Sequence, residues 1–164
     1  MSQERQWLEL GLDAIPPDRA ARVRLFRLLL MGAAALRGRL DRELAPSGLT
    51  SQQGAMLQWI EAQAEPPTVS AVAAGLRTTH QNVKQIAVAL ERKGFVEIVV
   101  DPADRRARRV VLTKQHRRFW RKRNPEDFGS VAAWTSALSD NEVAKMNQML
   151  SRLYRHLKEA DASR

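Results

Sequence analysis

The sequence predicts a mainly α-helical fold with one small β-hairpin. Apolar residues recur at helical spacing along most of the 164 residues. The period changes only over residues 96–113, where side chains alternate in the pattern of strands. The chain has no cysteine, which excludes disulfide scaffolds, thiolate metal sites and thiol chemistry. A chain of this length buries a core large enough to fold without such cross-links.

The first predicted element is an arm over residues 1–17, which ends in a Pro-Pro pair. A long helix is expected over residues 18–45, because its leucines lie four and seven residues apart on one helical face. A Pro-Ser-Gly run ends this helix.

A compact domain of helices and a hairpin is predicted over residues 46–113. The expected helices and strands cover residues 50–64, 69–75, 79–93, 96–100 and 109–113. Thr50 and Gln53 have the spacing of a capping box at the first of these helices. Gly94 stands where a left-handed cap would end the third helix. The polar segment DPADRRA, residues 101–107, is expected to form the hairpin tip.

Helical periodicity returns at Lys114, although Asn124-Pro125 is expected to break or kink the helix. Ser139 and Glu142 form a second capping-box pattern before the last helix. The apolar stripe of that helix would dock either on the chain's own core or on a second copy. The residues predicted for dimerisation are Val143, Met146, Leu150, Leu153 and Leu157.

The positive charge of the chain is concentrated in one segment. The whole chain carries a formal charge of +9, and residues 101–125 hold ten basic and two acidic side chains. A protein this basic usually has an anionic partner, most commonly nucleic acid. A solvated surface is the alternative interpretation of such a run.

The order of helix, short helix, turn, helix and basic hairpin is that of a winged helix-turn-helix. The helix over 79–93 has one apolar stripe and a polar face, as a helix in the DNA major groove requires. The candidate DNA-binding residues are Thr79, His80, Gln81, Asn82, Lys84, Gln85, Arg105, Arg106 and Arg108. Asp101 and Asp104 are acids at a tip that would face DNA, and they are expected to bond the loop backbone or to hold an arginine in the rotamer that reaches outward. An ordinary surface helix has a similar polar face, so the prediction of DNA binding depends largely on the basic hairpin that follows the helix.

Four stretches of the sequence resemble the MarR family of bacterial transcription regulators. They are residues 37–60, 68–97, 101–113 and 137–153. The third matches the family's wing pattern, D-x-x-D-x-R followed by an apolar strand and L-T. The family commonly continues with E-x-G, whereas this chain has a basic stretch over 114–123. That stretch is expected either to contact flanking phosphates or only to solvate its helix.

The resemblance implies an obligate homodimer whose terminal helices interlock, with residues 18–45 and 114–164 as the helical dimerisation region. It also implies that Asp104 buttresses the wing. It implies two recognition helices on a palindromic operator, with half-sites about one turn apart. Most members repress transcription, and many release DNA when a small, often aromatic, ligand binds between the dimer and DNA-binding regions. Candidates to line such an effector pocket are Phe26, Trp59, Trp120 and Trp134, although such aromatic side chains more often belong to the core.

The predicted function is that of a cytoplasmic, sequence-specific regulator that binds double-stranded DNA as a homodimeric repressor. A non-specific architectural or protein-binding winged helix remains open, since the charge supports it equally; the amide-rich face at 81–85 favours sequence reading. No enzyme is expected, because phosphate loops, zinc-protease motifs and nucleophile elbows are missing. No metal or cofactor is expected, because the three histidines lack ligand spacing. No membrane span is expected, and a membrane-surface helix at 114–123 would leave the helix-turn-helix unexplained.

Overall fold

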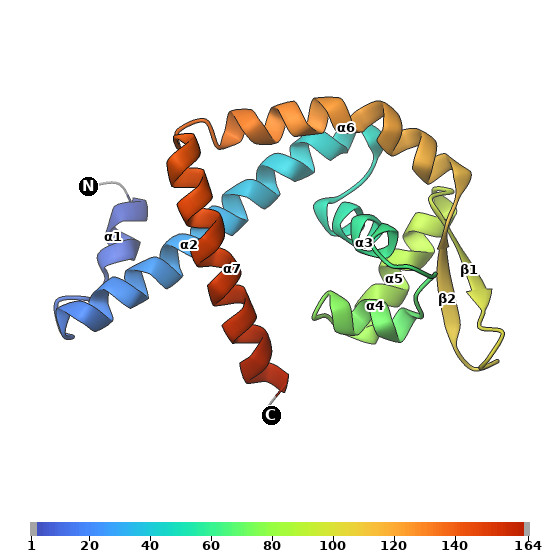
Figure 1. Ribbon diagram of the computed structural model, residues 1–164, viewed down its shortest axis with the longest axis horizontal. Helices are drawn as coiled ribbons and strands as arrows, with labels where there is room; N and C mark the ends of the chain where they lie inside the picture. Colours follow the sequence, from blue (N-terminus) through green and yellow to red (C-terminus); the bar gives the residue numbers. More distant parts are fainter. Residues whose placement is uncertain (1–2, 163–164) are drawn as a thin grey trace. The chain divides into compact units, whose positions relative to one another are not determined.

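The computed structural model describes residues 3–162 and divides into two compact units, one through Thr113 and one from Lys114 onward (Figure 1). The elements of the first unit are α1 (Gln3–Glu9), α2 (Pro17–Leu44), the 3-10 helix η1 (Ala45–Ser47), α3 (Ser51–Glu61), α4 (Val69–Gly75), α5 (His80–Arg92), β1 (Val96–Val100) and β2 (Arg108–Leu112). The second unit contains α6 (Lys114–Trp134) and α7 (Asp140–Ala162). This architecture confirms the predicted fold class, a helical chain with one antiparallel hairpin.

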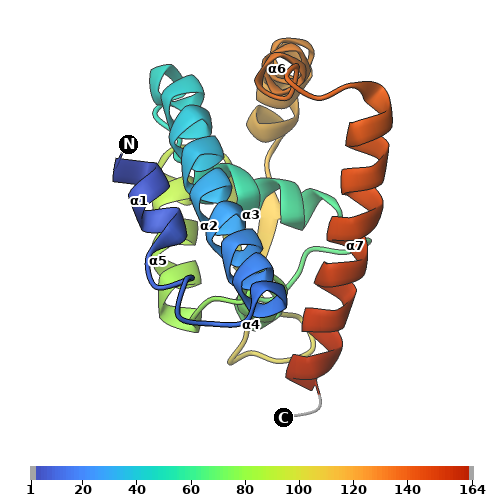
Figure 2. The ribbon, with the colours of Figure 1, turned by 90° about the vertical axis from the view of Figure 1, so that its left-hand side faces the viewer.

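The N-terminal arm is a short helix that lies against the beginning of α2 (Figure 2). The Glu9 carboxylate accepts two hydrogen bonds from the Arg24 guanidinium, at 2.8 and 2.7 Å. Arg27 donates to three carbonyl oxygens at the end of α1, and its guanidinium lies 5.6 Å from the centre of the Trp7 ring. A cation at this end is favoured by the helix dipole, so Arg27 acts as the C-terminal cap of α1.

The hydrophobic core of the first unit lies among α3, α4, α5 and the hairpin, which gather together in Figure 1. The wholly buried apolar side chains of these elements are Met56, Leu57, Val72, Val83, Ala87, Leu90 and Val110. Phe95 packs at the edge of this core, directly after Gly94, whose φ of 76° gives the left-handed cap that the sequence predicts. The core therefore holds α5 and the hairpin as one body.

The start of α3 is tied to α2 and to α5. Asp41, in the last turns of α2, accepts a 2.6 Å hydrogen bond from the Ser51 backbone N–H. Both halves of the predicted capping box form between Thr50 and Gln53. Lys93, which follows α5, donates to the Gln53 side-chain oxygen at 2.9 Å and to the carbonyl of Gly48. The end of α5 is thereby fixed to the junction of α2 and α3.

Helices α3 and α4 meet where Trp59 covers Gly75. A Cβ atom at Gly75 would lie 2.1 Å from Cζ2 of the Trp59 ring, well inside van der Waals contact. The close approach of these two helices therefore requires glycine at the end of α4.

Of the two effects expected of Asn124-Pro125, a break or a kink, the break is wrong, because α6 is continuous from Lys114 to Trp134. A proline inside a helix removes one main-chain hydrogen bond. Here the Arg123 guanidinium and the Asp127 carboxylate form an ion pair across Pro125, with a separation of 2.9 Å and both side chains largely covered. This i, i+4 pair stabilises the turn that the proline weakens.

Two long helices keep apolar side chains on their surface. The exposed large apolar residues of α2 and α7 are Leu25, Phe26, Leu28, Leu30, Leu36, Met146, Met149, Leu150, Tyr154 and Leu157. Of the five residues predicted for dimerisation, Val143 and Leu153 are half-buried and the other three are exposed. Over residues 3–162, no helix combines the length and hydropathy that a membrane span requires.

Candidate nucleic-acid interface

Helix α5 is buried along one side and exposed to solvent along the other. Val83, Ala87 and Leu90 are wholly buried, which fixes the rotation of the helix about its axis. Four of the polar residues predicted to bind DNA lie exposed on the remaining side: His80, Gln81, Lys84 and Gln85. They occupy the first two turns and present amide, imidazole and ammonium groups to solvent. Such groups can hydrogen-bond base edges or phosphates in a major groove.

Thr79 and Asn82, also predicted to bind DNA, are engaged in starting α5. The Thr79 hydroxyl accepts a 3.2 Å hydrogen bond from the Asn82 backbone N–H, as an N-cap does. The Asn82 side-chain amide donates to the Thr78 hydroxyl at 2.9 Å and is half-buried. Their hydrogen bonds set the geometry of the helix start and leave the next residues facing outward.

The wing is the hairpin of β1 and β2, and buried Asp101 fastens its tip (residues 101–107). Its Oδ1 accepts hydrogen bonds from the backbone N–H groups of Ala103, at 2.8 Å, and Asp104, at 3.4 Å. Its Oδ2 accepts a 2.7 Å hydrogen bond from Nε of Arg109. The N–H of Ala103 above all, together with the Arg109 guanidinium, holds the pKa of Asp101 below its usual value despite burial.

Arg109 also anchors the wing to the loop between α3 and α4. Its guanidinium donates to the Pro66 carbonyl at 2.8 Å. The Val110 backbone N–H donates to the Pro67 carbonyl at 2.9 Å, which continues the pairing beyond the hairpin. An isolated two-stranded hairpin has only marginal stability in water, so these contacts and the packing on the core keep the wing in place.

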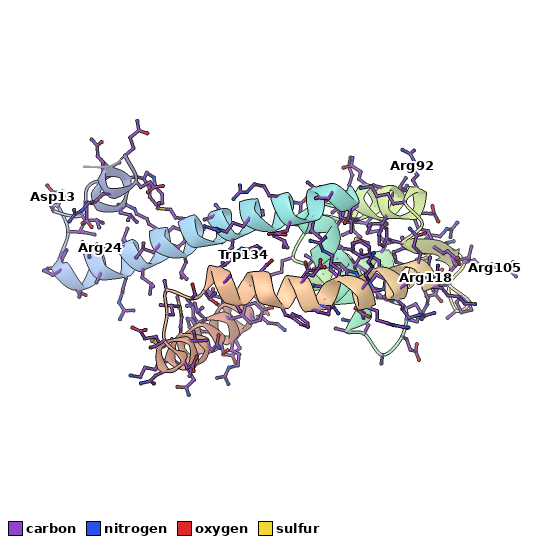
Figure 3. The ribbon with its side chains drawn as sticks, turned by 90° about the horizontal axis from the view of Figure 1, so that it is seen from above. Asp13, Arg24, Arg92, Arg105, Arg118 and Trp134 are labelled. Atoms are coloured by element: carbon purple, nitrogen blue, oxygen red, sulfur yellow. The ribbon has the colours of Figure 1, made fainter. Side chains whose placement is uncertain are left out.

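The predicted wing residues fall into two groups. Asp104 accepts a 2.9 Å hydrogen bond from the Arg106 backbone N–H, and the Arg108 guanidinium donates to the carbonyls of Arg105 and Ala107. These two side chains bond the backbone of the tip. Arg105 and Arg106 are exposed, and within residues 3–162 their side chains form no hydrogen bond or ion pair. Figure 3 shows Arg105 projecting from the wing.

A cleft of about 560 Å³ separates the start of α5 from the wing. His80 and Lys84 line it from α5, and Arg106 and Arg108 line it from the wing. The structure thus brings together four residues that the sequence predicts for DNA binding. Glu91 also lines the cleft, but its carboxylate accepts a 2.8 Å hydrogen bond from the backbone N–H of Ile98 and joins α5 to β1.

The four aromatic residues predicted for an effector pocket are divided between the two units. Phe26 is exposed on α2, and Trp59 packs against Gly75. Trp120 is buried and Trp134 is half-buried on α6, where 14 residues of helix separate them by about 21 Å. No group of three His, Asp or Glu residues in the described part of the chain is placed to hold a metal ion.

Sequence reasoning expected Asp101 to bond the loop backbone or hold an arginine, but it did not identify Arg109 as the arginine that Asp101 binds. A signal for them exists, because opposite charges near facing positions of a predicted hairpin commonly pair. Asp101 follows β1, and Arg109 pairs with Val99 in the observed register. Ser70 of α4, which lines the cleft, carried no signal in the sequence.

The fold and this arrangement define a winged helix-turn-helix protein. The model of the MarR family matches residues 47–107, from η1 to the wing tip. The helix-turn-helix and most of the wing of this chain are therefore similar to the MarR family.

One curated relative is the transcriptional activatory protein BadR of Rhodopseudomonas palustris. It is 34% identical over 102 residues, which cover 59% of this chain and 57% of BadR, so the chain matches just over half of that relative's length. Among solved structures, the MepR–DNA complex of S. aureus is 24% identical with a TM-score of 0.70, covering 79% of this chain and 95% of MepR. CouR of Rhodococcus jostii, solved with p-coumaroyl-CoA, is 23% identical with a TM-score of 0.67, covering 79% and 90% of the two chains.

Proposed function

We propose that this protein is a sequence-specific DNA-binding transcription regulator. The observation that carries the proposal is the pairing of an outward polar face on α5 with two unpartnered arginines on a fastened wing. The two surfaces flank one basic cleft. Duplex DNA offers a major groove for a helix and a negatively charged backbone beside it, so it matches both surfaces at once.

In the proposed complex, α5 enters the major groove by its first two turns. Gln81 and Gln85 are the best placed side chains for reading bases, because a glutamine amide bonds adenine through two hydrogen bonds. Lys84 reaches guanine or a phosphate. Arg105 and Arg106 enter the adjacent minor groove, where a narrow groove concentrates negative potential.

We propose a homodimer formed by the terminal helical region, residues 18–45 and 114–164. The exposed leucines, methionines and aromatic residues of α2 and α7 support this, because contiguous exposed apolar side chains mark an interface. Residues 46–113 serve as the DNA-binding domain. A two-fold dimer presents two copies of α5 and therefore binds a palindrome with half-sites about one DNA turn apart.

The regulator is proposed to repress, by occupying its operator, and to release DNA when a small-molecule effector binds. CouR was solved with p-coumaroyl-CoA, which makes an effector a reasonable part of the proposal. Activation is the second candidate, because the relative BadR is named as an activatory protein. A reporter gene driven by the bound promoter decides between them through the sign of its response to deletion of the regulator.

The first test is selection of bound duplexes from fragmented genomic DNA, followed by a footprint. The proposal expects an enriched palindrome protected over about two helical turns. If no sequence is enriched and affinity falls with salt alike on every duplex, binding is mostly counterion release. That result overturns the operator and favours an architectural protein.

A further inference from the structure

The first half of α6 carries a stripe of five cations on its exposed side. The five are Lys114, Arg117, Arg118, Arg121 and Lys122, and all are exposed. Their spacing of i, i+3, i+4, i+7 and i+8 places them on one side of a helix. Figure 3 shows Arg118 among the side chains of this helix. We call these five residues the α6 stripe.

The α6 stripe has no anionic partner in the described part of the chain. None of its five side chains takes part in a hydrogen bond or an ion pair there. Arg123 differs, because it pairs with Asp127 at 2.9 Å, and its position is about half a helical turn away from the middle of the stripe. The Asp127 carboxylate therefore pairs with a cation on the opposite side of α6 and not with the stripe.

The arrangement weakens α6 when the helix is considered alone. Its first turn contains no acidic residue, although the helix dipole favours negative charge there, and Lys114 and Arg117 stand in that turn instead. Like charges three and four residues apart repel one another along the stripe. A local cost without compensation in the chain is typical of a functional surface, and an anionic partner would remove it.

We propose that the α6 stripe binds backbone phosphates of duplex DNA outside the half-site that α5 contacts. The inference rests on the proposed function. Helix α6 begins one residue after Thr113, whose hydroxyl donates to the Gly94 carbonyl at 2.7 Å, so its first residue is tethered to the base of the wing. The stripe spans about 12 Å of helix, and DNA carries one charge per strand every 3.4 Å or so, which matches three or four phosphates.

A membrane surface fits the α6 stripe less well than DNA does. Helices that lie in a membrane interface insert an apolar face beneath their basic residues. On α6, the residues away from the stripe include buried His116 and Trp120 and the Arg123–Asp127 pair. This helix offers no free apolar face along its basic half, whereas phosphate binding requires none.

The experiment compares a stripe variant with a charge-matched control. The stripe variant is Arg117→Gln, Arg118→Gln and Arg121→Gln together, and the control is Arg19→Gln, Arg22→Gln and Arg39→Gln. Each set removes three exposed cations, and glutamine keeps a similar helix propensity. Binding is measured against salt on a duplex trimmed to the footprint and on one extended by about ten base pairs at each end.

We expect the unaltered protein to bind the extended duplex more tightly and with a steeper salt dependence. The stripe variant loses that gain, and its slope of log Kd against log salt falls by about 5.4, near 0.9 for each of the six phosphates that the two stripes of a dimer would no longer bind. That change corresponds to about 1,800-fold in affinity between roughly 50 and 200 mM salt. Its melting temperature should be unchanged or higher, because repulsion within α6 is relieved. The control keeps the slope of the unaltered protein.

Two results overturn the inference in distinguishable ways. If the unaltered protein binds its selected duplex but the stripe variant keeps its slope and its gain from extension, only the α6 stripe inference fails, and the stripe then serves another polyanion such as an acidic protein. A control that remains a dimer in sedimentation velocity and loses as much as the stripe variant also overturns it, since overall charge would be responsible. If the unaltered protein binds no duplex, the proposed function itself fails.

Discussion

The winged helix-turn-helix region encloses its own core, whereas α2 and α7 do not. Helices α3, α4 and α5 each bury several apolar side chains, and Met56, Leu57 and Val72 are wholly covered. Helix α2 has 28 residues and buries only Ala20 and Leu44, and no residue of α7 is buried over 140–160. Helical hydrophobic periodicity thus specifies two kinds of surface, one that folds a domain and one that stays exposed, and we propose that the exposed one binds a second copy.

The largest expected effect comes from charging the exposed apolar stripe of α7. Leu150→Glu places an unpaired carboxylate in the proposed dimer interface on both copies, which is strongly unfavourable. We expect a monomer in sedimentation velocity and a loss of operator affinity of about 100-fold or more, because two linked half-sites no longer bind together.

The matched control for this prediction is Gln148→Glu, which adds the same charge to the opposite side of α7. It should leave both the sedimentation coefficient and operator binding unchanged. Dimers of Leu150→Glu that persist at the concentrations where the unaltered protein is dimeric would contradict the assignment of this stripe.

The next largest effect is expected inside the self-contained core. Gly75→Ala places a methyl group on the Trp59 ring and should lower the free energy of unfolding by about 1–3 kcal/mol in a urea titration. Gly129→Ala is the control, because nothing lies within 4 Å of a Cβ there, and it should stabilise α6 by up to about 1 kcal/mol.

Trp59→Leu in the Gly75→Ala background tests whether the steric contact is the cause. The double variant should be more stable than the sum of the two single changes predicts, because leucine leaves room for the new methyl group. Strict additivity of the two changes would exclude the contact as the source of the effect.

Elements governed by local sequence could be predicted, and those governed by contacts could not. The Thr50–Gln53 capping box and the left-handed Gly94 depend on residues a few positions apart. Helix α6 is continuous through Pro125, and an ion pair between Arg123 and Asp127 spans the proline. The free-energy cost of a proline inside a helix can be predicted from the sequence. Which side chains will form contacts that offset this cost cannot be predicted from the proline alone.

The same division holds for the wing. The sequence shows four arginines around the hairpin tip and predicts a basic surface. It does not show that Arg108 and Arg109 are bound within the wing while Arg105 and Arg106 are not, because this depends on strand register and loop hydrogen bonds. Asp101 and Asp104 are likewise similar in sequence, and burial together with the bond to Arg109 distinguishes Asp101.

A pair of arginine variants sharpens this division. Arg106→Ala should weaken operator binding by about 1–3 kcal/mol, because an unpartnered side chain that contacts DNA is lost. Arg108→Ala should cost less, since its guanidinium is hydrogen-bonded to the carbonyls of the tip. Fluorescence anisotropy with an operator duplex measures both, and equal losses would show that the two arginines do not differ in role.

The smallest expected effect is on the fastening of the wing. Asp101→Asn keeps an oxygen that can accept from the Ala103 N–H but removes the charge opposite Arg109. We expect the tip to become partly disordered, which faster hydrogen exchange of the tip amides would show. Operator affinity should fall below that of Arg108→Ala only if the tip becomes fully disordered. The core should be unaffected, because α3, α4 and α5 do not depend on this pair.

The pH dependence of the wing distinguishes a charged fastening from a steric one. The folded pKa of Asp101 lies below its ordinary value, so the ionised carboxylate stabilises the wing above pH 4 or so. That contribution to stability declines as the pH falls through the pKa of Asp101 in the folded protein, because the protonated carboxyl group no longer forms an ion pair with Arg109. In NMR titrations, the Arg109 Nε–H and Ala103 N–H signals should shift together at acidic pH in the unaltered protein and not in Asp101→Asn. Identical titrations in both proteins would mean that the Asp101 charge does not hold the tip.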